Sequence, residues 1–212
     1  MIIEFLGDSI TQGGCATKVE NMYVNVVASD LGVTTINHGI GGTRIAKYHG
    51  ELLYPHDYLP FYSRVDELDP NADLVCVMGG VNDYGHGNAP VGKFGDTEVD
   101  TFYGALDYLI NLLVKKYSKD KILFIEPLYC IKEEDPRGYP WDPKTPRGPL
   151  EAYRVAIREV CAKYGIECTG EIKEKLGKPE EYANLYQDGL HPNDEGHIKL
   201  GHLVADYIKN RG

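Results

Sequence analysis

The sequence predicts an α/β fold, because short apolar runs alternate along the chain with longer amphipathic stretches. Strands that alternate with helices imply parallel crossovers, and therefore a three-layer α/β/α sandwich with helices on both faces of the sheet. Five runs are predicted to be short buried strands: Met1–Leu6, Val33–Ile36, Leu74–Met78, Ile122–Ile125 and Ile166–Cys168. Four stretches are predicted to be helices: about Val19–Leu31, Thr97–Tyr117, Pro149–Tyr164 and Asp194–Asn210. Asn193 or Asp194 would cap the last helix, just after Pro192.

Length and composition indicate one soluble domain. At 212 residues, with 42% hydrophobic and 25% charged residues, the chain can bury a substantial core. It shows neither an internal repeat nor a low-complexity linker, so we expect a single domain over residues 1–212. The formal net charge of -10 argues against nucleic acid and membrane surfaces as partners, since both attract basic patches. The acidic surface is interpreted mainly as a solubility feature.

The N-terminus and the cysteines favour a cytoplasmic location. Met1 to Leu6 is too short for a signal peptide or a membrane span, although a leader removed from the mature chain stays an open alternative. The cysteines are odd in number and lack Cys-x-x-Cys spacing, which predicts reduced thiols: Cys15, Cys76, Cys130, Cys161 and Cys168.

Two stretches far apart in the sequence carry the residue types of nucleophilic catalysis. Ser9 follows the first apolar run in a Gly-Asp-Ser turn, which places its hydroxyl at the carboxyl end of a predicted strand. Asp188 and His191 are three residues apart, so the acid can reach back to one ring nitrogen while the other faces outward. A serine, a base and an orienting acid together can activate a hydroxyl group.

Two further strand ends are rich in glycine. Residues 37–43 (Asn-His-Gly-Ile-Gly-Gly-Thr) follow the second strand, and residues 79–83 (Gly-Gly-Val-Asn-Asp) follow the third. Backbone N–H groups at glycines can approach a ligand closely, and Asn82 adds a side-chain amide donor. Such donors stabilise the negative charge that develops on a carbonyl oxygen during acyl transfer. In parallel sheets ligands bind at this carboxyl edge, where all these segments end.

With these four motifs the chain closely resembles the SGNH hydrolases, also called the GDSL family of lipases and esterases. The matching blocks are Gly7-Asp8-Ser9, Asn37 with Gly42, Gly80-x-Asn82-Asp83, and Asp188-x-x-His191. The resemblance implies Ser9 as nucleophile, His191 as general base and acid, and Asp188 as the residue that orients His191. It implies an oxyanion hole made of the N–H groups of Ser9 and Gly42 and the Asn82 amide. It also implies a five-stranded parallel sheet in the flavodoxin-like order 2-1-3-4-5.

Long irregular stretches near the same edge are expected to contact substrate. These are residues 48–62, 84–90 and 129–147, and they are dense in aromatic, histidine and proline residues. Such side chains suit the face of a sugar, although each can equally pack its loop against the body of the protein. The candidate substrate contacts are Asp8, Arg44, Tyr84, His86 and Trp141. For Asp8 and Asp83, turn aspartates that bind nearby backbone are the favoured interpretation.

The histidines do not form a metal motif. His191, His197 and His202 are spaced by six and five residues, which does not align them on one helix face as i, i+4 ligands. We therefore expect neither a metal nor a cofactor.

These observations predict a serine esterase that cleaves small acyl esters, above all acetyl, from a substrate such as an oligosaccharide. One alternative is a lipase-like or thioester hydrolase that acts on longer acyl chains. An alternative of another class is a non-catalytic carbohydrate-binding protein on an esterase fold. The sequence does not decide the exact ester or the oligomeric state.

Overall fold

The computed structural model describes residues 1–49, 51, 56, 58–135 and 148–211. The predicted strands form one parallel sheet in the order β2-β1-β3-β4-β5, which confirms the expected fold class. Their bounds are β1 Ile2–Gly7, β2 Thr34–Gly39, β3 Leu74–Met78, β4 Ile122–Ile125 and β5 Glu167–Thr169. The central strands β3 and β4 are buried along their whole length, as expected for strands covered on both faces.

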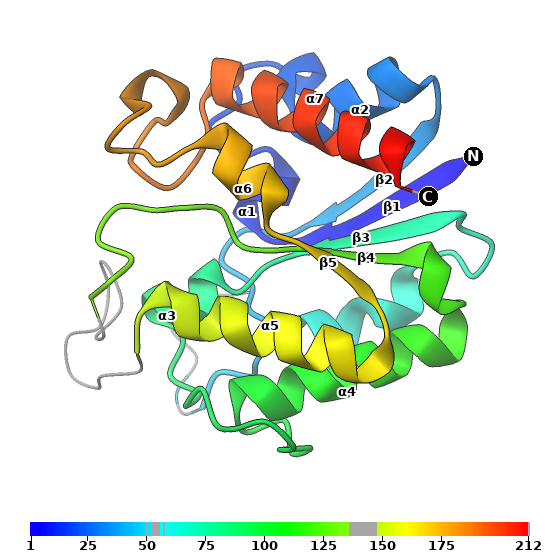
Figure 1. Ribbon diagram of the computed structural model, residues 1–212, viewed down its shortest axis with the longest axis vertical. Helices are drawn as coiled ribbons and strands as arrows, with labels where there is room; N and C mark the ends of the chain where they lie inside the picture. Colours follow the sequence, from blue (N-terminus) through cyan, green and yellow to red (C-terminus); the bar gives the residue numbers. More distant parts are fainter. Residues whose placement is uncertain (50, 52–55, 57, 136–147, 212) are drawn as a thin grey trace.

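Helices cover both faces of the sheet (Figure 1). One face carries α1 (Ser9–Gln12), α2 (Tyr23–Leu31), α6 (Glu171–Leu176) and α7 (Asp194–Asn210). The other carries α3 (Val81–His86), α4 (Phe102–Lys116) and α5 (Leu150–Tyr164). Short 3-10 helices join them: η1 Val19–Asn21, η2 Phe61–Glu67, η3 Lys119–Lys121 and η4 Ala183–Leu185. Each face buries its own apolar cluster against the sheet.

The strand register brings the carboxyl ends together. Gly7 of β1 pairs with Gly39 of β2 on one side and with Met78 of β3 on the other. Met78 pairs with Ile125 of β4, which in turn pairs with Thr169 of β5. The loops that leave these residues therefore start from one edge of the sheet, and they include three of the four motifs found in the sequence.

Three predicted segments differ from the structure, and the short helices α1 and α6 were not predicted. The predicted helix at Val19–Leu31 is interrupted at Met22, whose ψ of 131° is not helical, so η1 and α2 are separate. The helix predicted from Thr97 begins only at Phe102, because Thr101 caps it by accepting from the N–H of Gly104 at 3.0 Å.

The third difference concerns residues 84–90, which were expected to be a loop. Residues up to His86 belong instead to α3, because Gly80 has a φ of 112° and turns the chain from β3 directly into a helix. At α7 the cap is Asn193, whose side chain accepts from the N–H of Gly196 at 3.0 Å.

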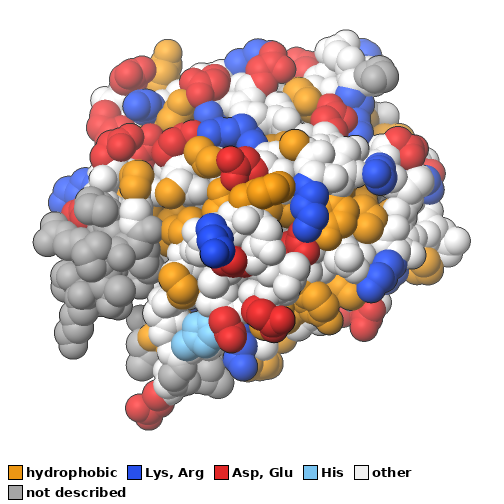
Figure 2. All heavy atoms as spheres, turned by 60° about the horizontal axis from the view of Figure 1, so that its bottom comes forward, with side chains coloured by type: hydrophobic (Ala, Val, Ile, Leu, Met, Phe, Trp, Pro, Cys, Tyr) orange, Lys and Arg blue, Asp and Glu red, His pale blue; other side chains and the backbone are white. Residues whose placement is uncertain are grey.

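The surface mixes both signs of charge. On the face drawn in Figure 2, acidic and basic side chains are interspersed among scattered hydrophobic ones. Among the helices of the described residues, none combines the length and the apolar character needed to cross a bilayer.

Candidate active site

The structure brings Ser9, His191 and Asp188 into one hydrogen-bonded row. Ser9 Oγ lies 2.8 Å from His191 Nε2, and His191 Nδ1 lies 2.8 Å from Asp188 Oδ2. Because Nδ1 faces a carboxylate, it carries the ring proton, and Nε2 is left as the acceptor for the serine hydroxyl. The side chain of His191 is 22% exposed, so the row is accessible from solvent.

The loop after η4 fixes the acid and the base relative to each other. Asp188 Oδ1 accepts the backbone N–H groups of Leu190 at 3.0 Å and His191 at 2.8 Å. Partial burial opposes ionisation of Asp188, but these bonds and the imidazole outweigh it and hold the pKa of the carboxyl below its ordinary value. Asp188 is therefore ionised at neutral pH and can stabilise a protonated His191.

Ser9 is the first residue of α1 and follows β1 after a single residue, Asp8. Asp8 Oδ1 accepts the N–H of Ile10 at 3.0 Å and caps this short helix. The Asp8 side chain is only 2% exposed. Burial raises the pKa of Asp8 to about 6, against the opposing effects of the Ile10 N–H and the charges of His191 and Arg64. The buried carboxyl group of Asp8 therefore caps the helix that begins at the nucleophile Ser9.

The glycine segment after β2 lies beside the nucleophile. A Cβ built on Gly41 would lie 3.7 Å from Ser9 Cβ, and the Gly41 N–H donates to Gln12 Oε1 at 3.0 Å. Gly42 has a φ of 76° with open space where a side chain would be. In the described part of the chain, no acceptor is paired with the N–H of Ser9 or of Gly42. Both donors are therefore available to a ligand.

Helix α3, which follows β3, carries Asn82 and Asp83, and both side chains bind the backbone just after Gly42. Asn82 Nδ2 donates to the carbonyl of Thr43 at 3.0 Å. The Asp83 carboxylate accepts the N–H groups of Ile45 at 2.9 Å and Ala46 at 2.8 Å. Burial raises the pKa of Asp83 to about 6, although these backbone donors favour its charged form. These bonds therefore join α3, which carries Asn82, to the Gly42 segment that lies beside Ser9.

Arg64 is a structural residue of the site that the sequence did not reveal. Its guanidinium is 1% exposed and donates to the carbonyls of His38 at 2.7 Å and Gly7 at 3.1 Å, and to Thr43 Oγ1 at 3.1 Å. Burial lowers the pKa of Arg64 to about 10, so it stays charged at neutral pH. One side chain thus joins the ends of β1 and β2 to the Gly42 segment.

The candidate substrate contacts occupy different places. Arg44 is 3% exposed and donates from Nη1 to Nδ1 of His86 at 2.7 Å. Tyr84 is fully buried, and its hydroxyl donates to the carbonyl of Lys132 at 2.5 Å. Trp141 lies outside the described residues. A substrate contact for Asp8, Arg44, Tyr84, His86 or Trp141 stays a prediction.

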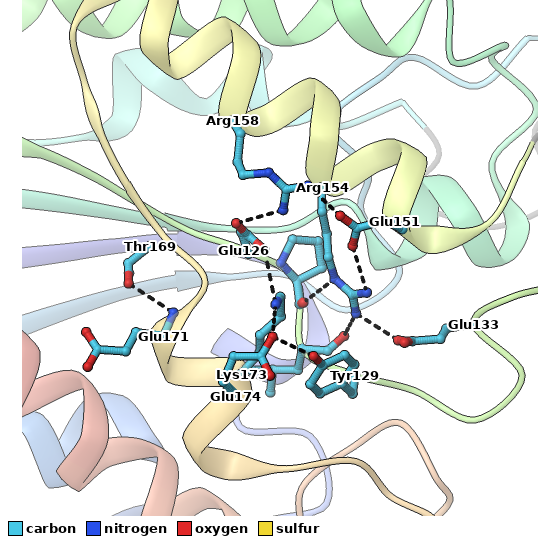
Figure 3. A network of polar contacts seen from close by, with 12 residues as sticks. Glu126, Tyr129, Glu133, Glu151, Arg154, Arg158, Thr169, Glu171, Lys173 and Glu174 are labelled. Carbon is cyan, nitrogen blue, oxygen red and sulfur yellow. Dashed lines mark hydrogen bonds and ion pairs between the residues drawn. The ribbon is translucent and has the colours of Figure 1, made fainter.

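A network of ion pairs fixes the segment that leaves β4 (Figure 3). Arg154 of α5 is 1% exposed and donates to the carbonyls of Pro127 at 3.1 Å and Leu128 at 3.0 Å. It also donates to Glu133 Oε2 at 2.8 Å. Beside it, the buried Glu126 pairs with Arg158 and Lys173, as Figure 3 shows. The sequence analysis did not predict this network, which anchors the start of the long segment expected over the site.

Cys15 lies close to the acid and the base. Its sulfur and one ligand atom each of Asp188 and His191 lie within 4.8 Å of one another. Cys15 is an exposed residue, but partial burial of its thiol, together with the charge of Asp188, raises the pKa of that thiol.

The other two histidines considered in the sequence have separate partners. His197 Nε2 lies 2.9 Å from the carbonyl of Gly14, and His202 pairs with Asp30.

Comparison with known proteins identifies the family and the fold. The model of the GDSL-like lipase/acylhydrolase family matches residues 5–198. A protein from Lactobacillus plantarum is 28% identical, with a TM-score of 0.81 over 99% of this chain and 97% of its own. A lipase/acylhydrolase from Enterococcus faecalis shares the fold at 23% identity, with a TM-score of 0.67 over 99% and 96%. A carbohydrate acetylesterase from Sinorhizobium meliloti does so at 18% identity, with a TM-score of 0.66 over 98% of both chains. Comparison with curated proteins gives no match.

The fold and the site define an α/β hydrolytic enzyme of the class that cleaves carboxylic esters. The chain belongs to the GDSL-like lipase/acylhydrolase family, as the match over most of its length shows.

Proposed function

We propose that this enzyme is a serine esterase that removes small acyl groups, above all acetyl, from a hydroxylated substrate such as an oligosaccharide. The observation that carries the proposal is the row Ser9–His191–Asp188, with both of its hydrogen bonds at 2.8 Å. This is the arrangement of a nucleophile, a base and an orienting acid.

In the proposed mechanism His191 Nε2 takes the hydroxyl proton as Ser9 Oγ attacks the ester carbonyl carbon. The carbonyl π bond opens, and the charge on its oxygen is bound by the N–H groups of Ser9 and Gly42 and by the Asn82 amide. The intermediate collapses, the C–O bond to the alcohol breaks, and His191 returns the proton to the leaving oxygen. Water, deprotonated by His191, then attacks the acyl carbon, the bond between that carbon and Ser9 Oγ breaks, and His191 returns the proton to Ser9 Oγ as the acid is released. Ionised Asp188 stabilises the imidazolium in both halves.

The small-acyl part of the proposal has two supports. Small groups lie against the row: a Cβ built on Gly14 would lie 3.3 Å from His191 Cδ2 and one built on Gly41 would lie 3.7 Å from Ser9 Cβ, and Cys15 lies beside Asp188 and His191. A protein with the same fold is named a carbohydrate acetylesterase. We also propose that the chain acts as one domain in the cytoplasm, without nucleic acid or membrane partners. The five free cysteines and the net charge of -10 support this part.

The test is hydrolysis of p-nitrophenyl acetate, butyrate and octanoate, run beside acetate release from acetylated xylan and mannan oligomers. Ser9→Ala should abolish turnover, whereas Ser29→Ala, at an exposed serine on α2, should leave it unchanged. Rates that fall with chain length and acetate release from the oligomers are the expected result. A preference for octanoate would favour the lipase-like alternative. Absence of turnover on every ester would overturn the esterase and favour a carbohydrate-binding protein.

A further inference from the structure

A chain of hydrogen bonds with a fixed direction ends at the Asn82 amide. Arg44 Nη1 lies 2.7 Å from His86 Nδ1, and His86 Nε2 lies 3.1 Å from Asn82 Oδ1. A guanidinium has only donors, so Nδ1 of His86 must be the acceptor in the first bond. The proton of the neutral ring is then on Nε2, which donates to Oδ1 of Asn82.

This direction, together with the Thr43 carbonyl, which can only accept, sets which way the amide of Asn82 faces. The two ends of an amide have nearly the same shape, so packing alone does not distinguish them. With Oδ1 bound to the N–H of His86, Nδ2 is turned to the opposite side, where it donates to the carbonyl of Thr43 at 3.0 Å. Thr43 follows Gly42, so Nδ2 of Asn82 lies beside the segment that carries the proposed oxyanion donor of Gly42. A flipped amide would present an oxygen to the developing negative charge and would repel it.

Other contacts hold the two ends of this chain in place. Arg44 is 3% exposed, its guanidinium lies over the ring of Tyr48 at 4.7 Å, and its carbonyl accepts the N–H of Phe61 at 2.9 Å. Asn82 and His86 are four residues apart on α3, one helical turn, which places their side chains on the same face. Neither Arg44 nor His86 therefore needs a bound substrate to reach the position that orients Asn82.

We propose that His86 is a positioning residue for the oxyanion hole, with its tautomer set by Arg44 and its Nε2–H directing the Asn82 amide toward the reacting carbonyl. The inference rests on the proposed function, since it concerns the same oxyanion. It assigns Arg44 and His86 a role in the chemical step that does not require contact with substrate.

Three substitutions at position 86 separate this role from simple packing. In His86→Gln the side-chain oxygen can accept from Arg44 and the nitrogen can donate to Asn82, so most of kcat should remain. His86→Leu has similar bulk but no donor, and kcat should fall by roughly tenfold, the value of about one lost hydrogen bond. His86→Glu offers only acceptors, which favours the flipped amide, and kcat should fall toward the loss in Asn82→Ala, on the order of 100-fold.

The measurement is kcat and KM on p-nitrophenyl acetate for these variants, with thermal unfolding to show that each is folded. The expected result is the order Gln, Leu, Glu in falling kcat, with KM changed less than about threefold. His86→Leu should also add little to Asn82→Ala in the double variant, since both act on one donor. Equal losses in Gln and Leu, an effect on KM alone, or full additivity with Asn82→Ala would overturn the inference. An inactive wild type or an Asn82→Ala variant with full activity would instead overturn the proposed function.

Discussion

Replacing Asp8 by asparagine is expected to stabilise the protein increasingly as the pH rises. Asp8 is fully buried, and burial raises its pKa from the ordinary 3.8 to about 6. A raised pKa means that the fold favours the protonated form, so the stability that Asp8 contributes is complete below pH 3.8 and is lost as the pH passes about 6. An interval of about two pH units corresponds to about 3 kcal/mol of unfolding free energy. Asparagine keeps an acceptor oxygen for the Ile10 N–H but cannot ionise.

The assay is urea unfolding of the wild type and Asp8→Asn at several values between about pH 4 and pH 7. The variant's advantage should grow by about 3 kcal/mol across this range. Asp83, whose pKa is also raised to about 6, is present in both proteins, so its own effect largely cancels in the difference. Asp206→Asn, at an exposed aspartate on α7, is the control and should show a gap that does not change with pH. A constant gap for Asp8→Asn would refute the reasoning from burial.

Three further outcomes are expected. Asp188→Asn should lower kcat on p-nitrophenyl acetate by about 10³- to 10⁴-fold with little change in KM, because it favours the wrong tautomer of His191; a loss below tenfold would contradict this. Iodoacetamide should modify Cys15 slowly at neutral pH and faster as the pH rises, since burial and Asp188 raise the pKa of its thiol. Mass spectrometry should follow the alkylation of Cys15, and esterase activity should fall in proportion to it. The Cys15→Ser variant should be active and should keep its activity in iodoacetamide. Arg154→Met should lower the unfolding free energy by about 3–5 kcal/mol, because Glu133 is left buried without its partner. In the same urea assay, Arg158→Met should cost much less, because the Arg158 side chain is 41% exposed and its buried partner Glu126 keeps Lys173; equal losses would contradict the argument.

The sequence predicted the inner strands β1, β3 and β4 well because they are largely buried, whereas the edge strand β2, also expected to be buried, has no buried residue. β3 and β4 consist of buried residues throughout, so each is visible as an uninterrupted apolar run. The same reasoning placed Ser9, Gly42 and Asn82 at one edge, since each follows a strand closely. Helix α3 was missed because six residues show too little periodicity, and the positive φ of Gly80 that starts it cannot be read from composition.

The buried arginines were beyond the reach of sequence patterns. Arg64 and Arg154 are each 1% exposed, although arginine is normally an exposed residue. Arg64 is buried because carbonyls from two strands and a threonine converge on it, and these partners come from three separate segments. Such convergence depends on the finished fold, so a linear pattern of residue types does not contain it. The same holds for the Arg44–His86 bond, which joins residues 42 positions apart.

The bonds around Arg64 have a consequence for how substrate preference can change in this fold. The Phe61 N–H donates to the Arg44 carbonyl at 2.9 Å, and Arg64 reaches back to Thr43 at 3.1 Å. Arg44 and Phe61 are therefore joined to each other, and Arg64 ties the adjacent Thr43 to the ends of β1 and β2. Lengthening a loop whose ends are already joined costs little entropy, about 0.6 kcal/mol for each doubling. Insertions between positions 50 and 57 should therefore leave Thr43, Arg44 and the ends of β1 and β2 in place, which makes these positions suitable for redesigning the enzyme toward other esters.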